Sequence, residues 1–154
     1  MLVPYCAFAA SQIQVVRLGS IPIADLVKRN LQAEFLHHFV RVPERNLRAL
    51  QAMPGPKKLV HSVLDLSGIG RQHLRHIGAI KKFMGVLPSI IPDVTQTVSI
   101  INAPRVFSMI WKMVSPIVPS ATKRKVNILG GPDTFEERLV SLADKDLYPA
   151  FCFS

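Results

Sequence analysis

The stretch SVLDLSGIG, which runs from Ser62 to Gly70, decides the fold of this 154-residue chain. Its first half is typical of a strand, and Asp-Leu-Ser-Gly marks where that strand ends. Similar runs predict strands over Ile13 to Leu18, Leu59 to Leu64, Thr97 to Ile101 and Lys125 to Leu129. Amphipathic runs between them predict helices over Ala24 to Phe39, Glu44 to Ala52, Arg71 to Leu87, Arg105 to Ser115 and Thr134 to Ala143. This alternation indicates an α/β fold with a largely parallel sheet.

The two ends of the chain carry weaker signals. Residues 1–12 are expected to form an irregular lead-in, and because no Lys or Arg precedes their apolar run, a secretory signal is disfavoured. Cys6 and Cys152 lie near opposite ends, which provides neither a disulfide scaffold nor a closed metal site. Within the chain, Met53-Pro54-Gly55-Pro56 is predicted to stop one helix, and Pro88 with Pro92 is predicted to stop another before the third strand.

Composition and charge narrow the function. The chain is 49% apolar with a mean hydropathy of +0.27, yet it contains no run long enough to span a bilayer. The excess apolar surface therefore indicates an internal ligand pocket or a partner interface. A net charge of +9 favours anionic membranes or nucleic acid. No aromatic residues interleave with the basic runs, so we expect no nucleic-acid binding.

Four phrases in fixed order give a resemblance. SVLDLSGIG, SIINAPRVF (from Ser99), ATKRKVNILGG (from Ala121) and DLYPAF (from Asp146) together resemble the CRAL-TRIO lipid-binding domain, over residues 13–151. The resemblance implies that the sheet forms the floor of a lipid pocket, that helices surround it and that one mobile helix is its lid. It also implies a carrier of phosphatidylinositol, phosphatidylcholine, tocopherol or retinoids, with no cofactor. The helical module that usually precedes the first strand is lacking here, as are the glycines expected after DLYPAF.

The segment Pro104 to Val118 is the predicted lid. Its polar residues fall on one narrow helical stripe, and the remaining positions are apolar over a wider arc than packing on one sheet requires. Such a helix needs apolar surroundings on two sides, as between a lipid and a bilayer. The alternative is a buried core helix. The lid residues expected to touch the lipid are Phe107, Ile110, Trp111 and Val114.

Four residues are candidates for the lipid headgroup. By the resemblance, Thr122 and Lys125 contact an inositol phosphate, and Asp93 holds the inositol hydroxyls or the lysine. The residues alone favour the alternative, a solvated basic turn beside an unrelated aspartate. Ser62 corresponds to a hydroxyl that helps hold choline lipids, but the second hydroxyl of that site corresponds here to Val60. A core serine bonded to the backbone remains open for Ser62.

Catalytic and metal sites are not expected. The sequence has no Gly-x-Ser-x-Gly elbow, no phosphate-binding Gly-x-x-x-x-Gly-Lys loop and no His-Glu-x-x-His helix. The five histidines lack nearby cysteines and have few neighbouring carboxylates, so we interpret them as surface or boundary residues rather than metal ligands. His73 and His76 do share one helical face.

The leading prediction is a cytoplasmic, monomeric lipid carrier that attaches transiently to anionic membranes and transfers or presents one lipid, phosphatidylinositol or a related phospholipid. A second hypothesis is a membrane-recruitment or protein-interaction domain without lipid exchange. A non-transferring fragment of a larger protein is a further alternative, and a basic nucleic-acid-binding domain is the third class.

Overall fold

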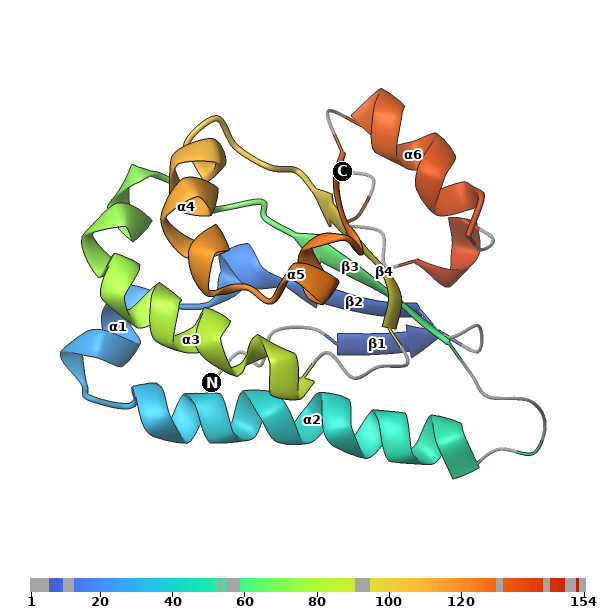
Figure 1. Ribbon diagram of the computed structural model, residues 1–154, viewed down its shortest axis with the longest axis horizontal. Coiled ribbons are helices and arrows are strands. Elements are labelled where there is room, and N and C mark those ends of the chain that lie inside the picture. Colours follow the sequence, from blue (N-terminus) through green and yellow to red (C-terminus); the bar gives the residue numbers. More distant parts are fainter. Residues whose placement is uncertain are drawn as a thin grey trace.

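The computed structural model describes residues 6–9, 13–52, 54, 59–90, 95–129, 132–142, 145–148 and 152. One five-stranded sheet organises them, with its strands in chain order from one edge to the other (Figure 1). The strands are β1 (Cys6–Ala9), β2 (Ile13–Arg17), β3 (Val60–Asp65), β4 (Thr95–Ile101) and β5 (Val126–Ile128). β1 is antiparallel to β2, and every other pair is parallel. The predicted α/β fold with a largely parallel sheet is confirmed.

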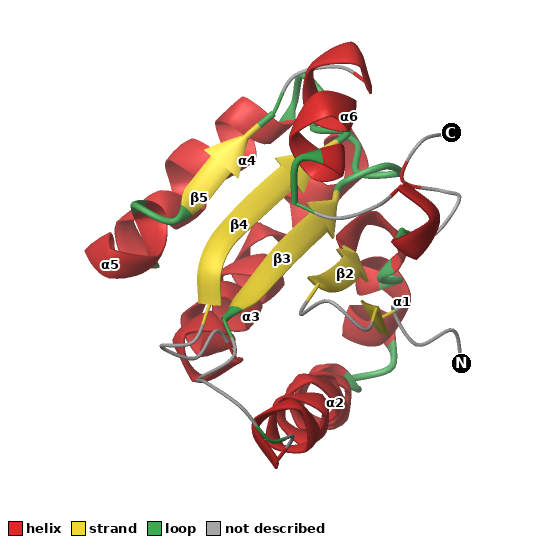
Figure 2. Cartoon of the chain, turned by 90° about the vertical axis from the view of Figure 1, so that its right-hand side faces the viewer, coloured by secondary structure: helices red, strands yellow, loops and turns green. Residues whose placement is uncertain are grey.

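Helices cover both faces of this sheet (Figure 2). One face carries α1 (Ile23–Lys28), α2 (Gln32–Ala52), α3 (Ile77–Ile90), α4 (Phe107–Val114) and α5 (Ser120–Lys123), together with the short 3-10 helices η1 (Leu18–Ser20), η2 (Arg71–His76) and η3 (Ser115–Ile117). The other face carries α6 (Pro132–Val140) and η4 (Lys145–Leu147). Because parallel strands are buried on both faces, they read as nearly continuous apolar runs.

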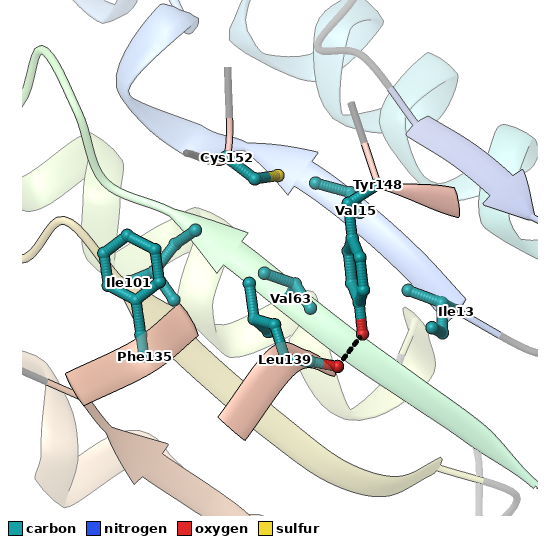
Figure 3. Close-up of a cluster of buried hydrophobic side chains, with 8 residues drawn as sticks. All are labelled: Ile13, Val15, Val63, Ile101, Phe135, Leu139, Tyr148 and Cys152. Atoms are coloured by element: carbon teal, nitrogen blue, oxygen red, sulfur yellow. Dashed lines mark hydrogen bonds between the residues drawn. The ribbon is translucent and has the colours of Figure 1, made fainter. Parts of the chain in front are cut away.

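The core beneath α6 is built from alternate strand positions. Side chains of successive strand residues point to opposite faces, so the odd-numbered positions of β2, β3 and β4 face α6. Figure 3 shows them meeting residues of α6 and of the chain that follows it. The cluster consists of Ile13, Val15, Val63, Ile101, Phe135, Leu139, Tyr148 and Cys152. This face of the sheet is closed, since none of these side chains is more than 6% exposed.

Three sequence predictions are wrong in detail. Cys6–Ala9, expected to lie in an irregular lead-in, pairs with β2 as the edge strand β1. The helical break expected between Phe39 and Glu44 is absent, and α2 continues through that segment. The break lies instead at Asn30, whose φ of 55° is a conformation that asparagine tolerates at a helix end.

Pro88 also does not stop its helix, because α3 runs to Ile90. The helix stop predicted at Met53-Pro54-Gly55-Pro56 agrees with the end of α2 at Ala52.

Tyr148 ties the end of the chain to α6. Its hydroxyl donates a hydrogen bond of 2.7 Å to the backbone carbonyl of Leu139, and the side chain is buried (Figure 3). Burial, followed by the nearby Cys152, raises the pKa of Tyr148 to about 12. Burial, followed by Asp65, raises the pKa of the Cys152 thiol to about 12, although Arg17 acts in the opposite direction. Both groups therefore stay neutral, as an apolar core requires.

Tyr148→Phe should lower the free energy of unfolding by about 1 kcal/mol, because it removes one buried hydrogen bond without removing the ring. Urea unfolding followed by circular dichroism measures this difference. An unchanged midpoint and slope would mean that the hydroxyl contributes nothing to holding the terminal segment.

Candidate functional site

The sheet face opposite α6 contains a cavity of about 130 Å³. Its floor is formed by the even-numbered strand residues, among them Leu64 of β3, Val98 and Ile100 of β4, and Val126 of β5. Residues from η1, α1, α2, η2, α3, α4 and α5 form its walls. Every lining side chain is apolar except those of His73 and Thr122. The predicted pocket with the sheet as its floor is therefore present, and it selects for apolar ligands.

Aromatic rings form much of the wall. Phe35 of α2 contacts Phe83 of α3 edge-to-face, with ring centroids 5.7 Å apart, and stacks on Phe39 at 5.8 Å. Phe107 and Trp111 of α4 lie 6.0 Å apart. All five rings line the cavity. Because the four phenylalanine rings offer no hydrogen bonds, they can accommodate aliphatic chains of varied position.

The predicted lid helix forms as α4, although it is shorter than the predicted segment and continues as η3. The four predicted lid residues Phe107, Ile110, Trp111 and Val114 all line the cavity. On the outer side of the same helix, Met109 is 50% exposed and Met113 is 40% exposed. A helix with apolar residues on both its cavity side and its solvent side is not a wholly buried core helix.

The size of the cavity limits what it can hold in this conformation. An apolar cavity of about 150 Å³ accommodates a benzene molecule. The observed cavity of about 130 Å³ therefore admits a small part of a lipid chain. A whole lipid requires the walls to move apart.

Three of the four predicted headgroup residues lie in one half of the site. Thr122 lines the cavity, and the N–H of Lys125 donates a 3.0 Å hydrogen bond to the Thr122 carbonyl. The Lys125 carbonyl accepts a 2.8 Å bond from the N–H of Val98, which pairs in register with Ser62. Ser62 is buried on the floor side of β3 without being a lining residue. Asp93 lies outside the described residues.

The side chains of Thr122 and Lys125 are both half-buried. Within the described part of the chain, neither forms a side-chain hydrogen bond or an ion pair. Of the two, Thr122 lines the cavity, whereas Lys125 precedes the lining residue Val126 and is not itself a lining residue.

A polar cluster around Asp65 lies at the carboxyl ends of β2, β3 and β4, and none of its residues was among the predicted site residues. Asp65, which is fully buried, accepts hydrogen bonds from Ser67 N (2.9 Å), Ser67 Oγ (2.7 Å) and Asn102 Nδ2 (3.0 Å). Arg17 Nε lies 3.3 Å from Oδ2 of Asp65, the same oxygen that accepts the bond from Ser67 Oγ. The sequence already indicated this cluster, because Arg17, Asp65 and Asn102 each lie within one residue of the end of a predicted strand. Parallel strands bring such residues to one edge of the sheet.

Glycines allow the loops at this edge to approach each other. A side chain at Gly19 would place its Cβ 1.6 Å from the carbonyl oxygen of Ser67, so only glycine fits there. Gly68 has a φ of +88°, which other residues rarely adopt. The residues beside these glycines, Leu18 and Ile69, line the cavity. The polar cluster therefore fixes the position of this wall.

The histidines do not form a metal site. No cluster of three or more potential metal ligands occurs among the described residues. The Nδ1 atom of His61 lies 2.8 Å from Thr97 Oγ1 on the α6 side of the sheet, and burial, followed by Arg138, lowers the pKa of His61. Of the described helices, none is long and apolar enough to cross a membrane.

Comparison with known proteins gives a consistent match. The family model of the CRAL/TRIO domain matches residues 11–152. Protein real-time of Anopheles gambiae is 28% identical over 145 residues, which covers 89% of this chain and 21% of that protein. A CRAL-TRIO domain-containing protein of Caenorhabditis elegans is 24% identical over 142 residues, covering 88% of this chain and 34% of that protein. The chain therefore spans about a fifth to a third of these relatives.

A solved structure shows the same fold. The crystal structure of Sfh5 superposes with a TM-score of 0.52 and 16% sequence identity. The match covers 81% of this chain and 45% of that chain.

Asp65→Asn should lower the free energy of unfolding by about 3 kcal/mol, because the amide turns donors towards Ser67 and Asn102 inside a buried site. Asp25→Asn is the matched control, since Asp25 is exposed and pairs with Arg29 one helical turn away. It should cost less than about 0.5 kcal/mol. Equal losses in urea unfolding would show that burial of Asp65 is not what matters.

Proposed function

Because the chain belongs to the CRAL/TRIO domain family, whose members bind lipids or other small hydrophobic ligands, we propose that it carries one phospholipid in the cavity beneath α4. Phosphatidylinositol or a related phospholipid is the proposed ligand, transferred or presented between membranes. Family members are lipid-binding transfer proteins and not typically enzymes. The observation that carries the proposal is the cavity lined by apolar side chains beneath a helix that is apolar on both sides.

The proposed ligand lies with its acyl chains between the sheet floor and the aromatic wall. Its phosphate lies at the end where Thr122 and Lys125 are found, and these two residues are proposed to hold it. A hydroxyl and an ammonium together donate hydrogen bonds to phosphate oxygens. The buried hydroxyl of Ser62 and the carboxylate of Asp93 are retained as proposed contributors to the headgroup site.

Charge supports contact with an anionic membrane. Residues 71–129 contain nine Lys and Arg and a single acidic residue, Asp93. This segment includes η2, α3, α4, η3 and α5, which are five of the eight helical elements on the cavity side of the sheet. Each cation near an anionic surface contributes about 1 kcal/mol. The proposed orientation therefore places α4 against the membrane, with Met109 and Met113 facing the lipid. The cytoplasmic leaflet, which is the anionic one, is the proposed target.

Lipid exchange requires α4 to move. The cavity is smaller than a lipid, so the walls must separate for a ligand to enter. In the proposed mechanism α4 swings away from the floor at the bilayer, and its inner residues exchange the cavity for lipid chains. A single chain contains the whole cavity, so the proposed carrier is a monomer.

The small cavity also favours a second candidate function. A domain that docks on anionic membranes without extracting a lipid needs the charged face and the outer methionines but no large pocket. The chain spans about a fifth of Protein real-time, so a recruitment module within a longer protein fits this alternative.

Native mass spectrometry of the purified protein, followed by organic extraction, separates the two functions. A lipid carrier releases one phospholipid per chain, whereas a folded but empty protein supports the recruitment alternative. Ile110→Trp should abolish the bound lipid, because Ile110 is 4% exposed and lines the cavity. Met109→Trp, on the outer side of the same helix, should leave it in place. Circular dichroism must show that both variants fold, since overfilling a core costs about 1–3 kcal/mol.

Lys125→Ala should reduce phosphatidylinositol transfer between liposomes by about tenfold or more, because a charge-assisted hydrogen bond is worth about 1.5–3 kcal/mol. Transfer of an uncharged lipid such as diacylglycerol should be unchanged. Lys123→Ala makes the same change in net charge two residues away and should affect neither lipid selectively. An equal loss of transfer for both lipids in Lys125→Ala would contradict the assignment of the headgroup.

A further inference from the structure

Two of the five methionines of the chain, Met109 and Met113, lie in the eight-residue helix α4. They are one helical turn apart, and their side chains are 50% and 40% exposed. The adjacent positions Ile110 and Val114 are buried and line the cavity, whereas neither methionine is a lining residue. Both thioethers can therefore be reached from solvent without any movement of the helix.

The other sulfur-containing side chains whose surroundings the structure describes are less accessible. Cys152 is fully buried, and its raised pKa keeps the thiol from ionising. Because the thiolate is the form that oxidants attack, this cysteine is protected. Met84 of α3 is half-buried and lines the cavity. A small oxidant dissolved in water should therefore reach the two methionines of α4 first.

Methionine differs from leucine at such positions in two properties. The helix propensities of the two residues are about equal, and both present an apolar surface to a bilayer. Methionine is more flexible, which only broadens the range of surfaces it fits. Its thioether can also be oxidised to a sulfoxide and reduced again, and leucine has no equivalent chemistry. The exposed pair on α4 therefore combines an apolar contact with a site of reversible oxidation.

Oxidation changes the polarity of this contact. A hydroperoxide transfers one oxygen atom to the sulfur, so that the O–O bond breaks and an S–O bond forms. Sulfur is oxidised by two electrons, and the proton of the transferred oxygen passes to the departing one, which leaves as water or, from a lipid hydroperoxide, as an alcohol. The sulfoxide oxygen accepts hydrogen bonds from water, and hydrocarbon offers no donors in exchange.

We propose that Met109 and Met113 form a reversible oxidation site, at which hydroperoxides convert both thioethers to sulfoxides and thereby release the protein from membranes. The inference rests on the proposed membrane contact of α4 and adds a regulation of that same surface. The oxidised protein retains its cavity ligand, because the inner residues Ile110 and Val114 are unchanged. Reduction of the sulfoxides restores the membrane contact.

The test measures binding to vesicles of phosphatidylcholine and phosphatidylserine by sedimentation, before and after treatment of the protein with hydrogen peroxide. Peptide mapping by mass spectrometry should find Met109 and Met113 oxidised before Met84. Vesicle binding should weaken about tenfold or more, which corresponds to about 1.4 kcal/mol or more. The thermal midpoint and the lipid seen by native mass spectrometry should be retained. Treatment with methionine sulfoxide reductases should restore binding.

Three variants assign the effect to the two sulfur atoms. The double variant Met109→Leu/Met113→Leu removes both thioethers and keeps the surface apolar, so its vesicle binding after peroxide should equal its own binding before. Met84→Leu is the matched control and should respond to peroxide as the wild type does. The double variant Met109→Gln/Met113→Gln carries polar side chains of similar length and should bind vesicles weakly without any oxidant. Circular dichroism checks that each variant folds.

The remaining outcomes overturn the inference in distinguishable ways. If peroxide leaves Met109 and Met113 unmodified, or if the double leucine variant stays sensitive to peroxide, these methionines are not the oxidation site. If both sulfoxides form and vesicle binding is unchanged, the inference fails and the proposed function stands. If the untreated protein carries a phospholipid but binds no vesicles, lipid carriage stands and the membrane contact of α4 fails together with its regulation. If it neither carries lipid nor binds vesicles, the proposed function fails as well.

Discussion

The fully buried carboxylate of Asp65 is the constraint on which the arrangement of this protein depends. An ionised group in the interior persists only when its lone pairs are satisfied. Ser67 supplies two donors, Asn102 supplies one, and Arg17 supplies a neighbouring charge. These partners come from the ends of three adjacent strands, so one side chain fixes how β2, β3 and β4 terminate. The turns that follow are then held in place, including Asn102 with its φ of 53°.

The two faces of the sheet have different tasks. Beneath α6, residues such as Val63, Leu139 and Cys152 are completely buried, and this face provides stability. On the opposite face the packing is incomplete, because the helices leave a cavity lined by rings and aliphatic chains. A close-packed interior contains few voids larger than a water molecule. The cavity therefore lies on the face of the sheet opposite the closely packed cluster beneath α6.

Much of this architecture could be predicted from the sequence, because short β-rich runs, strand-ending motifs and a helix apolar over a wide arc are local signals. The four parallel strands and the inner residues of α4 follow from them. β1 could not be predicted from such local signals, because its pairing with β2 depends on a tertiary contact. The continuation of α2 through Pro43 could not be predicted either, because proline inside a helix is locally unfavourable.

The exposed methionines on the outer side of α4 explain why the proposed opening costs little free energy at a membrane. Moving an apolar helix from a cavity into water costs about 25 cal/mol for each Å² of apolar surface exposed. Moving it into a bilayer avoids that cost, because lipid chains replace the lost contacts. Met109 and Met113 are already exposed in the closed form, so contact with lipid removes apolar surface from water before the inner residues leave the cavity. In the proposed mechanism, opening is therefore favoured at a membrane and opposed in solution, so that lipid exchange would occur at the surface that supplies the lipid.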